Sequence, residues 1–274
     1  MGKRIRRWLI IVASTYGAAC LFVGMFQSRL IYFPDREYDA TPSDVGLAFE
    51  RIALATSDGE TLAAWYVPAA DAKSTILYFH GTGGNMSDRL AALQLLHRLG
   101  YHVLMVDYRG YGESTGTPGE HGMYRDAEAA WRFLVDSKQA APEHIVFWGR
   151  SLGGAIAIEL ASRHEPAALV VESTFTRMAD VARIHYALLP VDWMLTQRFP
   201  SVDHVAQMAC PKLFFHGRDD GLIPLSIGKR LFDAAAEPKR FIETPGGHRS
   251  GGFASEAWHV EMVEAFLEAA LEGD

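Results

Sequence analysis

Gly149-Arg150-Ser151-Leu152-Gly153-Gly154 is the stretch that decides how this chain of 274 residues folds. An apolar run at residues 145–148 leads into it, and a run of helical composition at residues 155–162 follows it. A strand, a G-x-S-x-G turn and a helix in this order form a nucleophile elbow, which presents a serine hydroxyl at the top of a sheet. Glycine is needed on both sides of the serine because a side chain would collide with so tight a turn. We therefore expect Ser151 to be a nucleophile.

A second G-x-S-x-G sequence, at residues 112–116, tests this interpretation. It contains Ser114 and has the same spacing, but no apolar run leads directly into it and no helical run follows it. The Thr117-Pro118-Gly119 sequence after it is typical of a loop. Because the elbow requires a strand before the serine and a helix after it, we expect Ser114 to be a loop residue.

Short apolar runs alternate with helical stretches along most of the chain. The runs at residues 75–79, 103–106, 145–148, 168–171, 212–215 and 240–242 predict strands, and helices are predicted at 88–99, 125–136, 152–162, 226–235 and 255–271. Two further runs, 49–56 and 61–67, flank Asp58-Gly59 and predict a hairpin at one edge. This alternation indicates an α/β fold, with a mostly parallel sheet covered by helices on both faces.

In such a sheet the loops after the carboxyl ends of the strands carry the ligand-binding residues. The loop His80-Gly81-Thr82-Gly83-Gly84-Asn85 follows the strand at 75–79, and its glycines let backbone N–H groups point into a cleft. One of them and the N–H of Leu152 are suited to form an oxyanion hole, in which each donor typically contributes about 3 kcal/mol. A phosphate-binding loop is the rival interpretation, but neither Gly-Lys-Ser/Thr nor G-x-G-x-x-G is present. His80 is expected to hold the loop.

Two other strand ends supply an acid and a base. Asp219 and Asp220 follow the strand at 212–215, where a carboxylate can hold the tautomer of a histidine. His248 stands in a glycine-flanked loop after the strand at 240–242, and an ordinary imidazole pKa near 6.5 suits proton transfer at neutral pH. His259 also follows the two acids, but it falls inside the predicted last helix, so we interpret it as an ordinary helix residue.

Together these motifs resemble those of the α/β-hydrolase-fold serine hydrolases, particularly a bacterial single-pass, extracytoplasmic branch related to eukaryotic membrane-associated acyl hydrolases. The resemblance covers roughly residues 28–272. The motifs that carry it are the loop from His80 to Asn85, the loop from Asp107 to Ser114, the Ser151 turn, His216-Gly217 with Asp220 and Pro224, and Gly247-His248. It implies an α/β-hydrolase fold with a mostly parallel, eight-stranded sheet and a small cap insertion at about residues 174–209.

The resemblance also implies roles for particular residues. The acid of this family lies four residues after the motif histidine His216, which selects Asp220 and leaves Asp219 as a solvated turn residue. The resemblance thus implies that Ser151, Asp220 and His248 are the catalytic residues. The oxyanion hole would combine Thr82 and Leu152, although many relatives have asparagine where Thr82 stands, which leaves Gly83 as the alternative donor. The family's loop that contains Ser114 is mainly structural. No metal or organic cofactor is implied.

The amino terminus has the charge pattern of a membrane anchor. Four basic residues precede an uncharged apolar run from Trp8 to Phe26, which as a helix spans roughly 28 Å, close to the thickness of a hydrocarbon core. Basic residues on one side predict a cytoplasmic amino terminus, with the rest of the chain outside. A cleaved signal peptide or a lipoprotein signal around Gly17-Ala18-Ala19-Cys20 is the alternative, but the apolar run continues past that site.

We therefore expect a signal-anchor segment at residues 1–27, which contacts the membrane through residues 8–26, and a catalytic domain at residues 28–274. The protein would be a single-pass protein of the cell inner membrane with its catalytic domain outside the cytoplasm, in the periplasm of a double-membraned bacterium. A net charge of −7 argues against a nucleic-acid partner. Two cysteines in distant segments, Cys20 and Cys210, favour neither a disulfide framework nor a zinc site.

These features predict a hydrolase of carboxylic esters or thioesters that forms an acyl-enzyme on Ser151. The cap insertion is rich in large apolar residues, among them Phe175, Tyr186 and Trp193, which would either line an acyl pocket or pack the cap on the sheet. The substrate would be a small-molecule or lipid-like ester. A serine peptidase or acylaminoacyl peptidase would use the same residues, and a non-catalytic interaction protein is the alternative of another class. The sequence does not define the acyl chain length or the oligomeric state.

Overall fold

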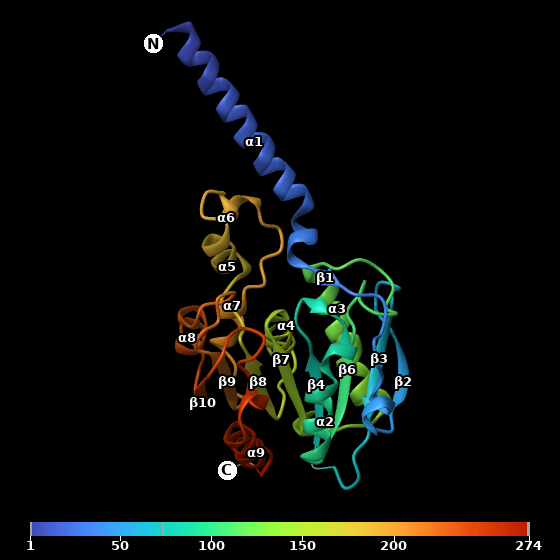
Figure 1. Cartoon of the computed structure of the whole chain (residues 1–274). Coiled ribbons are helices and arrows are strands. Elements are labelled where there is room, and N and C mark those ends of the chain that lie inside the picture. Colours follow the sequence, from blue (N-terminus) through green and yellow to red (C-terminus); the bar gives the residue numbers. More distant parts are fainter. Residues whose placement is uncertain (1, 73, 273–274) are drawn as a thin grey trace.

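A computed structural model describes residues 2–72 and 74–272 of the chain (Figure 1). The strands of its main sheet are β2 (Glu50–Ala55), β3 (Thr61–Val67), β4 (Ser74–Phe79), β6 (Tyr101–Val106), β7 (Ile145–Arg150), β8 (Ala168–Glu172), β9 (Lys212–Gly217) and β10 (Lys239–Thr244). Their order is β10-β9-β8-β7-β4-β6-β3-β2. The strands from β10 to β6 in this order are parallel, whereas β3 pairs antiparallel with both β6 and β2. The predicted α/β class, the eight-stranded sheet and the edge hairpin are confirmed.

Alternate side chains of the inner strands enter two separate cores, because successive residues of a strand point to opposite faces. In β7, Ile145 and Phe147 belong to the core on one face, and Val146 and Trp148 belong to the core on the other. All four are fully buried. A nearly continuous apolar run is therefore the mark of a strand that is covered on both faces.

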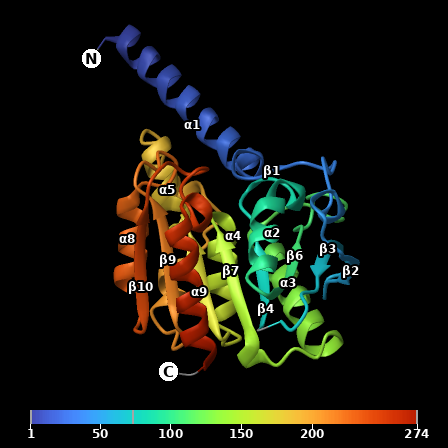
Figure 2. The same ribbon diagram turned by 60° about the horizontal axis from the view of Figure 1, so that its bottom comes forward.

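Helices supply these covers (Figure 2). On one face lie α3 (Glu120–Arg132), α4 (Leu152–Ala161) and α8 (Leu225–Ala234), and on the other lie α2 (Leu90–Arg98) and α9 (Ala257–Glu272). Short 3-10 turns are present at Pro42–Val45, Met86–Arg89, Pro142–His144 and Phe253–Ser255, and a π turn at Phe133–Ser137. Between β8 and β9 the chain forms three short helices, α5 (Met178–His185), α6 (Val191–Met194) and α7 (Ser201–Val205). We call residues 174–209 the cap.

The first helix, α1 (Lys3–Ile31), has 29 residues and projects from the carboxyl edge of the sheet beside α5 and α6 of the cap (Figure 1). Among the described residues it is the one helix long and apolar enough to cross a membrane. The helix continues past the apolar run that ends at Phe26 as far as Ile31, and no helix-breaking proline occurs before Pro34. The chain then forms β1 (Phe33–Pro34), which pairs in parallel with β5 (Gly83–Gly84). No sequence pattern predicted this pairing.

The turn between β7 and α4 is possible only because two glycines let the helix pack directly on the sheet. A Cβ atom on Gly149 would lie 2.2 Å from the carbonyl oxygen of Gly153, and a Cβ atom on Gly153 would lie 2.0 Å from the carbonyl oxygen of Phe79. Both distances are far shorter than a carbon–oxygen contact allows. The atoms that leave no room for a side chain at these two predicted glycines are backbone atoms, which cannot move aside as the end of a flexible side chain can.

We expect Gly149→Ala to destabilise the fold by about 3 kcal/mol, because the added methyl group has to push backbone away from backbone. For a chain of this size that corresponds to a melting temperature on the order of 6–12 °C lower, measured in detergent solution. Gly119→Ala is the control, since its added Cβ would make an ordinary 3.9 Å contact with Gln197. Equal melting temperatures for the two variants would show that the elbow tolerates a side chain.

Candidate active site

Ser151 occupies the turn between β7 and α4 in a left-handed backbone conformation, with φ 52° and ψ −118°. Such angles are uncommon for a residue with a side chain and persist where the surroundings enforce them. Here the N–H of Ser151 donates to the carbonyl of Glu172 (2.8 Å), and its carbonyl accepts a hydrogen bond from the hydroxyl of Thr174 (2.6 Å). Both partners belong to the end of β8 and the loop after it. The serine is thus fixed at the carboxyl edge of the sheet.

The structure brings the predicted histidine and acid to this serine. His248 Nε2 lies 3.0 Å from Ser151 Oγ, and His248 Nδ1 lies 2.8 Å from Asp220 Oδ2. The other oxygen of the buried Asp220 accepts hydrogen bonds from the N–H groups of Leu222 (3.0 Å) and Ile223 (2.8 Å). Burial alone would raise the pKa of Asp220, but the interactions with His248 and the Ile223 amide outweigh it and lower that pKa. A carboxylate on Nδ1 leaves Nε2 able to take the serine proton.

The motif histidine, His216, supports the turn that carries Asp220. It is buried between β9 and α8, and its Nε2 lies 2.8 Å from the carbonyl oxygen of Ile223. Burial lowers the pKa of His216, so the neutral ring is favoured and can donate this hydrogen bond. Gly228 lies directly against the ring, where a Cβ atom would come within 2.2 Å of His216 Nδ1.

Arg150 connects the loop that carries His248 to the turn that carries Ser151. Its guanidinium donates hydrogen bonds to the carbonyl oxygens of His248 (2.7 Å) and Arg249 (3.0 Å). It also lies 4.0 Å from the carboxylate of Glu172, which is buried and accepts a 2.6 Å hydrogen bond from the indole of Trp148. Arg150, next to Ser151, therefore holds the backbone of His248, and the buried carboxylate of Glu172 orients Arg150 in turn.

The loop after β4 is held by one buried carboxylate. Asp107 Oδ1 accepts a hydrogen bond from the N–H of Met86 (2.8 Å) and lies 3.1 Å from His80 Nε2. Asp107 Oδ2 accepts a hydrogen bond from the hydroxyl of Tyr38 (2.8 Å). His80 is fully buried and its ring lies against this carboxylate, which fits the expected structural role.

Thr82 and Leu152 line the same cavity as Ser151. Leu152 is the first residue of α4, so its N–H has no carbonyl partner within the helix. The hydroxyl of Thr82 donates to the carbonyl of Ile31, and the carbonyl of Thr82 accepts a hydrogen bond from the N–H of Phe33 (3.1 Å). The end of α1 and strand β1 thus hold the loop in which the second oxyanion donor was predicted.

The residues that the sequence offered as alternatives to Ser151, Asp220 and His248 have different surroundings. Ser114 is fully buried, where its hydroxyl donates to the carbonyl of Asp107 (2.7 Å) and accepts a hydrogen bond from the N–H of Ala63 (2.9 Å). Asp219 is exposed, as expected of a turn residue. His259 is buried in α9 on the face of the sheet opposite α4.

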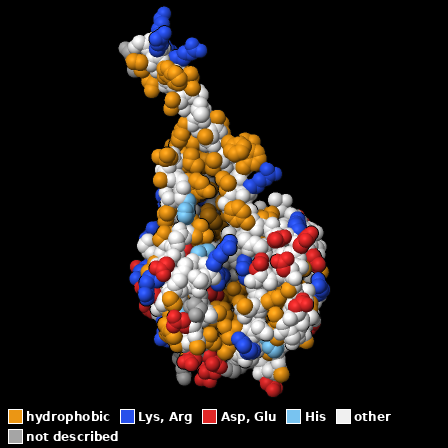
Figure 3. Space-filling model, viewed as in Figure 1, with side chains coloured by type: hydrophobic (Ala, Val, Ile, Leu, Met, Phe, Trp, Pro, Cys, Tyr) orange, Lys and Arg blue, Asp and Glu red, His pale blue; other side chains and the backbone are white. Residues whose placement is uncertain are grey.

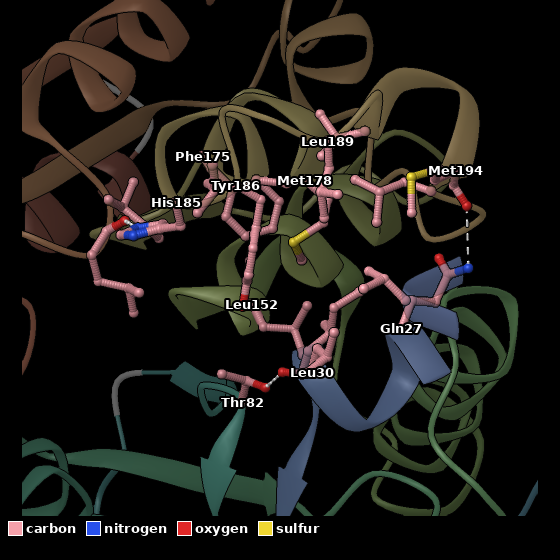
Figure 4. A pocket seen from close by; sticks show the side chains of 18 of the residues that line it. Gln27, Leu30, Thr82, Leu152, Phe175, Met178, His185, Tyr186, Leu189 and Met194 are labelled. Carbon is pink, nitrogen blue, oxygen red and sulfur yellow. Dashed lines mark hydrogen bonds between the residues drawn. The ribbon is translucent and has the colours of Figure 1, made fainter. Parts of the chain in front are cut away.

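A cavity of about 400 Å³ adjoins Ser151, within the range typical of small-molecule sites (Figure 4). Most of its lining is apolar and comes from α1, from the cap and from the loop after β9. In Figure 4, Gln27 and Leu30 of α1 face Met178 and Met194 of the cap across this space. Among the described residues, no cluster of three or more His, Cys, Asp or Glu side chains is placed to hold a metal ion.

Two parts of the site were missed by sequence reasoning. The first is Arg150, whose position in the elbow motif does not reveal that it reaches the histidine loop. The second is the contribution of α1, since Val23, Gln27 and Leu30 were expected within or just after a membrane anchor. Their spacing of four and three residues puts them on one face of a helix, and a glutamine at the end of an apolar run is the signal that could have found this face.

Comparisons with known proteins place the chain in a family. A family model for hydrolases, described as serine aminopeptidase S33, matches residues 70–204. An uncharacterized protein of Mycobacterium tuberculosis is 37% identical over 96% of this chain and 95% of its own length. The lysophosphatidylserine lipase ABHD12 of Danio rerio is 32% identical over 86% of this chain and 74% of its own. A solved structure, an esterase of Pyrococcus furiosus, matches with a TM-score of 0.71 and 20% identity over 88% of this chain and 98% of that one.

The sheet order, the turn that carries Ser151 and these relatives together define the class of protein: the chain belongs to the α/β-hydrolase family.

We expect Arg150→Gln to slow the labelling of Ser151 by a fluorophosphonate probe at least tenfold, because hydrogen bonds from a charged donor to the His248 loop are lost. The rate of labelling with time measures this effect. Arg249→Gln is the matched control, since the Arg249 side chain is exposed and only its backbone carbonyl contacts Arg150. Unchanged labelling of the Arg150 variant would mean that the histidine loop does not need this clamp.

Proposed function

We propose that this protein is a membrane-anchored serine hydrolase that cleaves carboxylic ester or thioester bonds of apolar acyl substrates. The observation that carries the proposal is the hydrogen-bonded series Asp220–His248–Ser151 at an apolar cavity. Membership of the α/β-hydrolase family supports a hydrolase. The activity for which ABHD12 is named, that of a lysophosphatidylserine lipase, supports ester-linked lipids as the substrate class.

The reaction would proceed in two steps. In the first, Ser151 Oγ attacks the acyl carbonyl carbon while His248 Nε2 takes the hydroxyl proton, and the same nitrogen then gives that proton to the departing alcohol or thiol. In the second, a water molecule attacks the acyl carbon while His248 Nε2 takes one of its protons. That proton returns to Ser151 Oγ as the ester bond to the serine breaks and the acid leaves.

The negative charge on the carbonyl oxygen would be held by backbone N–H groups of Leu152 and Thr82. The first sits at the amino terminus of α4, where the helix dipole also favours a negative charge. Thr82 is preferred over Gly83 because Thr82 lines the cavity together with Ser151, whereas Gly83 pairs with Phe33 in the small sheet. No metal or organic cofactor takes part in these steps.

A peptidase is the second candidate, because the matching family model is described as a serine aminopeptidase. An aminopeptidase has to bind the ammonium group of its substrate, for which a carboxylate is the suitable partner. None of the described residues that line the cavity is an aspartate or a glutamate. The lining instead suits an acyl chain, which favours esters and thioesters.

The length, apolar composition and flanking charges of α1 support an anchor in the cell inner membrane, with the catalytic domain outside the cytoplasm. We expect a carboxyl-terminal alkaline phosphatase fusion to be active in a bacterial host and a carboxyl-terminal fusion to a cytoplasmic reporter to be inactive. The opposite pair of results would place the domain in the cytoplasm.

We expect the full-length protein to hydrolyse p-nitrophenyl esters and the Ser151→Ala variant to lose this activity. Asp220→Asn should lower kcat about 10⁴-fold, because the amide no longer holds the required histidine tautomer. Asp219→Asn, one residue away and exposed, should change kcat less than about twofold, since surface changes of this kind cost little.

The chain-length profile from acetyl to palmitoyl esters completes this experiment. A preference for longer acyl chains would support the apolar cavity as the acyl site, whereas much better hydrolysis of acetyl esters would contradict it. If no ester is hydrolysed but peptide or acyl-aminoacyl substrates are, the peptidase candidate replaces the esterase.

A further inference from the structure

One face of α1 forms a wall of the cavity beside Ser151. Val23, Gly24, Gln27, Leu30 and Ile31 all line it, and they recur at the spacing of a single helical stripe. The opposite face of the same helix is exposed, as at Leu21 and Met25, which is 77% exposed. The helix that we propose as the membrane anchor is therefore also part of the candidate substrate site.

Polar contacts hold α1 and the cap together. The side-chain amide of Gln27 donates to the carbonyl of Met194 (3.3 Å), and its carbonyl oxygen accepts a hydrogen bond from the N–H of Thr196 (2.8 Å). Further along the helix, the hydroxyl of Tyr16 donates to the carbonyl of Leu188 (2.6 Å). The cap thus follows α1 from residue 27 back to residue 16.

This contact sets the depth of the cap. Tyr16 lies about 15 Å along the helix from Phe26, which is about half the thickness of a hydrocarbon core. Leu188, which bonds to Tyr16, is therefore level with the middle of the apolar run. Leu188 is 87% exposed and Trp193, in the neighbouring helix α6, is 94% exposed. Large apolar side chains left open to this extent beside a membrane span are typical of a membrane-contact surface.

Hydrophobic side chains gather along α1 and over the adjoining part of the cap (Figure 3). Two charged residues of the cap, Arg183 and Asp192, stand near Leu188 and Trp193 in the sequence and are paired with each other, which lowers the cost of bringing them toward lipid. We call the exposed residues Leu188 and Trp193 the cap tip.

We propose that the cavity between α1 and the cap is an acyl-chain channel that opens sideways into the bilayer. The cap tip would be immersed in the leaflet into which the channel opens. The substrate would then be an amphiphile whose single acyl chain slides from the lipid into the channel, while its ester carbonyl reaches Ser151. This inference rests on the proposed hydrolase function and its anchor, and adds where the substrate comes from and which helix selects it.

Gly24 offers a direct test because a Cβ atom there would meet nothing within 4 Å. A phenylalanine at this position would extend into the channel without a clash at its base. We expect Gly24→Phe, in full-length protein reconstituted in bilayer nanodiscs, to lower the ratio of kcat/KM for p-nitrophenyl dodecanoate to that for p-nitrophenyl acetate at least tenfold. Met25→Phe adds a ring on the opposite face and should leave the ratio unchanged.

The outcomes separate the two proposals. If the wild-type protein is labelled by a fluorophosphonate and hydrolyses esters, but Gly24→Phe leaves the ratio unchanged, the channel is overturned and the hydrolase stands. If the wild-type protein is neither labelled nor active on any ester, the proposed function itself fails and the channel fails with it.

Immersion of the cap tip has a readout that needs no activity. In bilayers of phosphatidylcholine and phosphatidylglycerol brominated on their acyl chains, we expect quenching of the fluorescence that Trp193 contributes, obtained as the difference between the wild-type protein and Trp193→Phe. An equal contribution of Trp193 in brominated and ordinary bilayers would place the cap tip in water and overturn the sideways opening.

Discussion

The close approach of α4 to strands β4 and β7 is the contact on which the carboxyl edge of the sheet depends. Two glycines permit it, and it forces Ser151 into a left-handed turn whose amide and carbonyl are bound by the end of β8 and the loop after it. The neighbouring Arg150 then extends from this turn to the backbone of His248. One backbone constraint thus fixes the serine, the start of the helix behind it and the loop that carries the candidate base.

Two buried aspartates organise the loops on either side of this turn. Asp220 accepts two backbone N–H groups as well as the imidazole of His248, and Asp107 accepts the N–H of Met86 and the hydroxyl of Tyr38. A buried carboxylate is costly unless it is hydrogen-bonded, so each loop is held in the conformation that satisfies its carboxylate. Two buried carboxylates therefore hold the loops on either side of Ser151.

Sequence patterns predicted what local chemistry determines. The strands were predicted because burial on both faces requires continuous apolar runs. Ser151, Asp220 and His248, which the structure brings together, were predicted as site residues because a motif and a family resemblance mark them. Contacts between distant segments carry no such mark. The pairing of β1 with β5 involves two residues on each side, and the stripe of α1 that faces the cavity is nearly as apolar as the rest of that helix. Within that stripe only Gln27 has a polar side chain, and this side chain bonds to Met194 and Thr196 of the cap as well as to Gly24 of its own helix.

The hydroxyl of Thr82 is bonded to the last carbonyl of α1, and the next strand of the chain pairs with the same loop. A helix of 29 residues moves as a stiff rod, so a change in its tilt displaces its end. In a chain anchored as we propose, a thinner or thicker bilayer would tilt that rod differently. The thickness of the surrounding lipid would then change the position of the loop that lies beside Ser151, the candidate nucleophile.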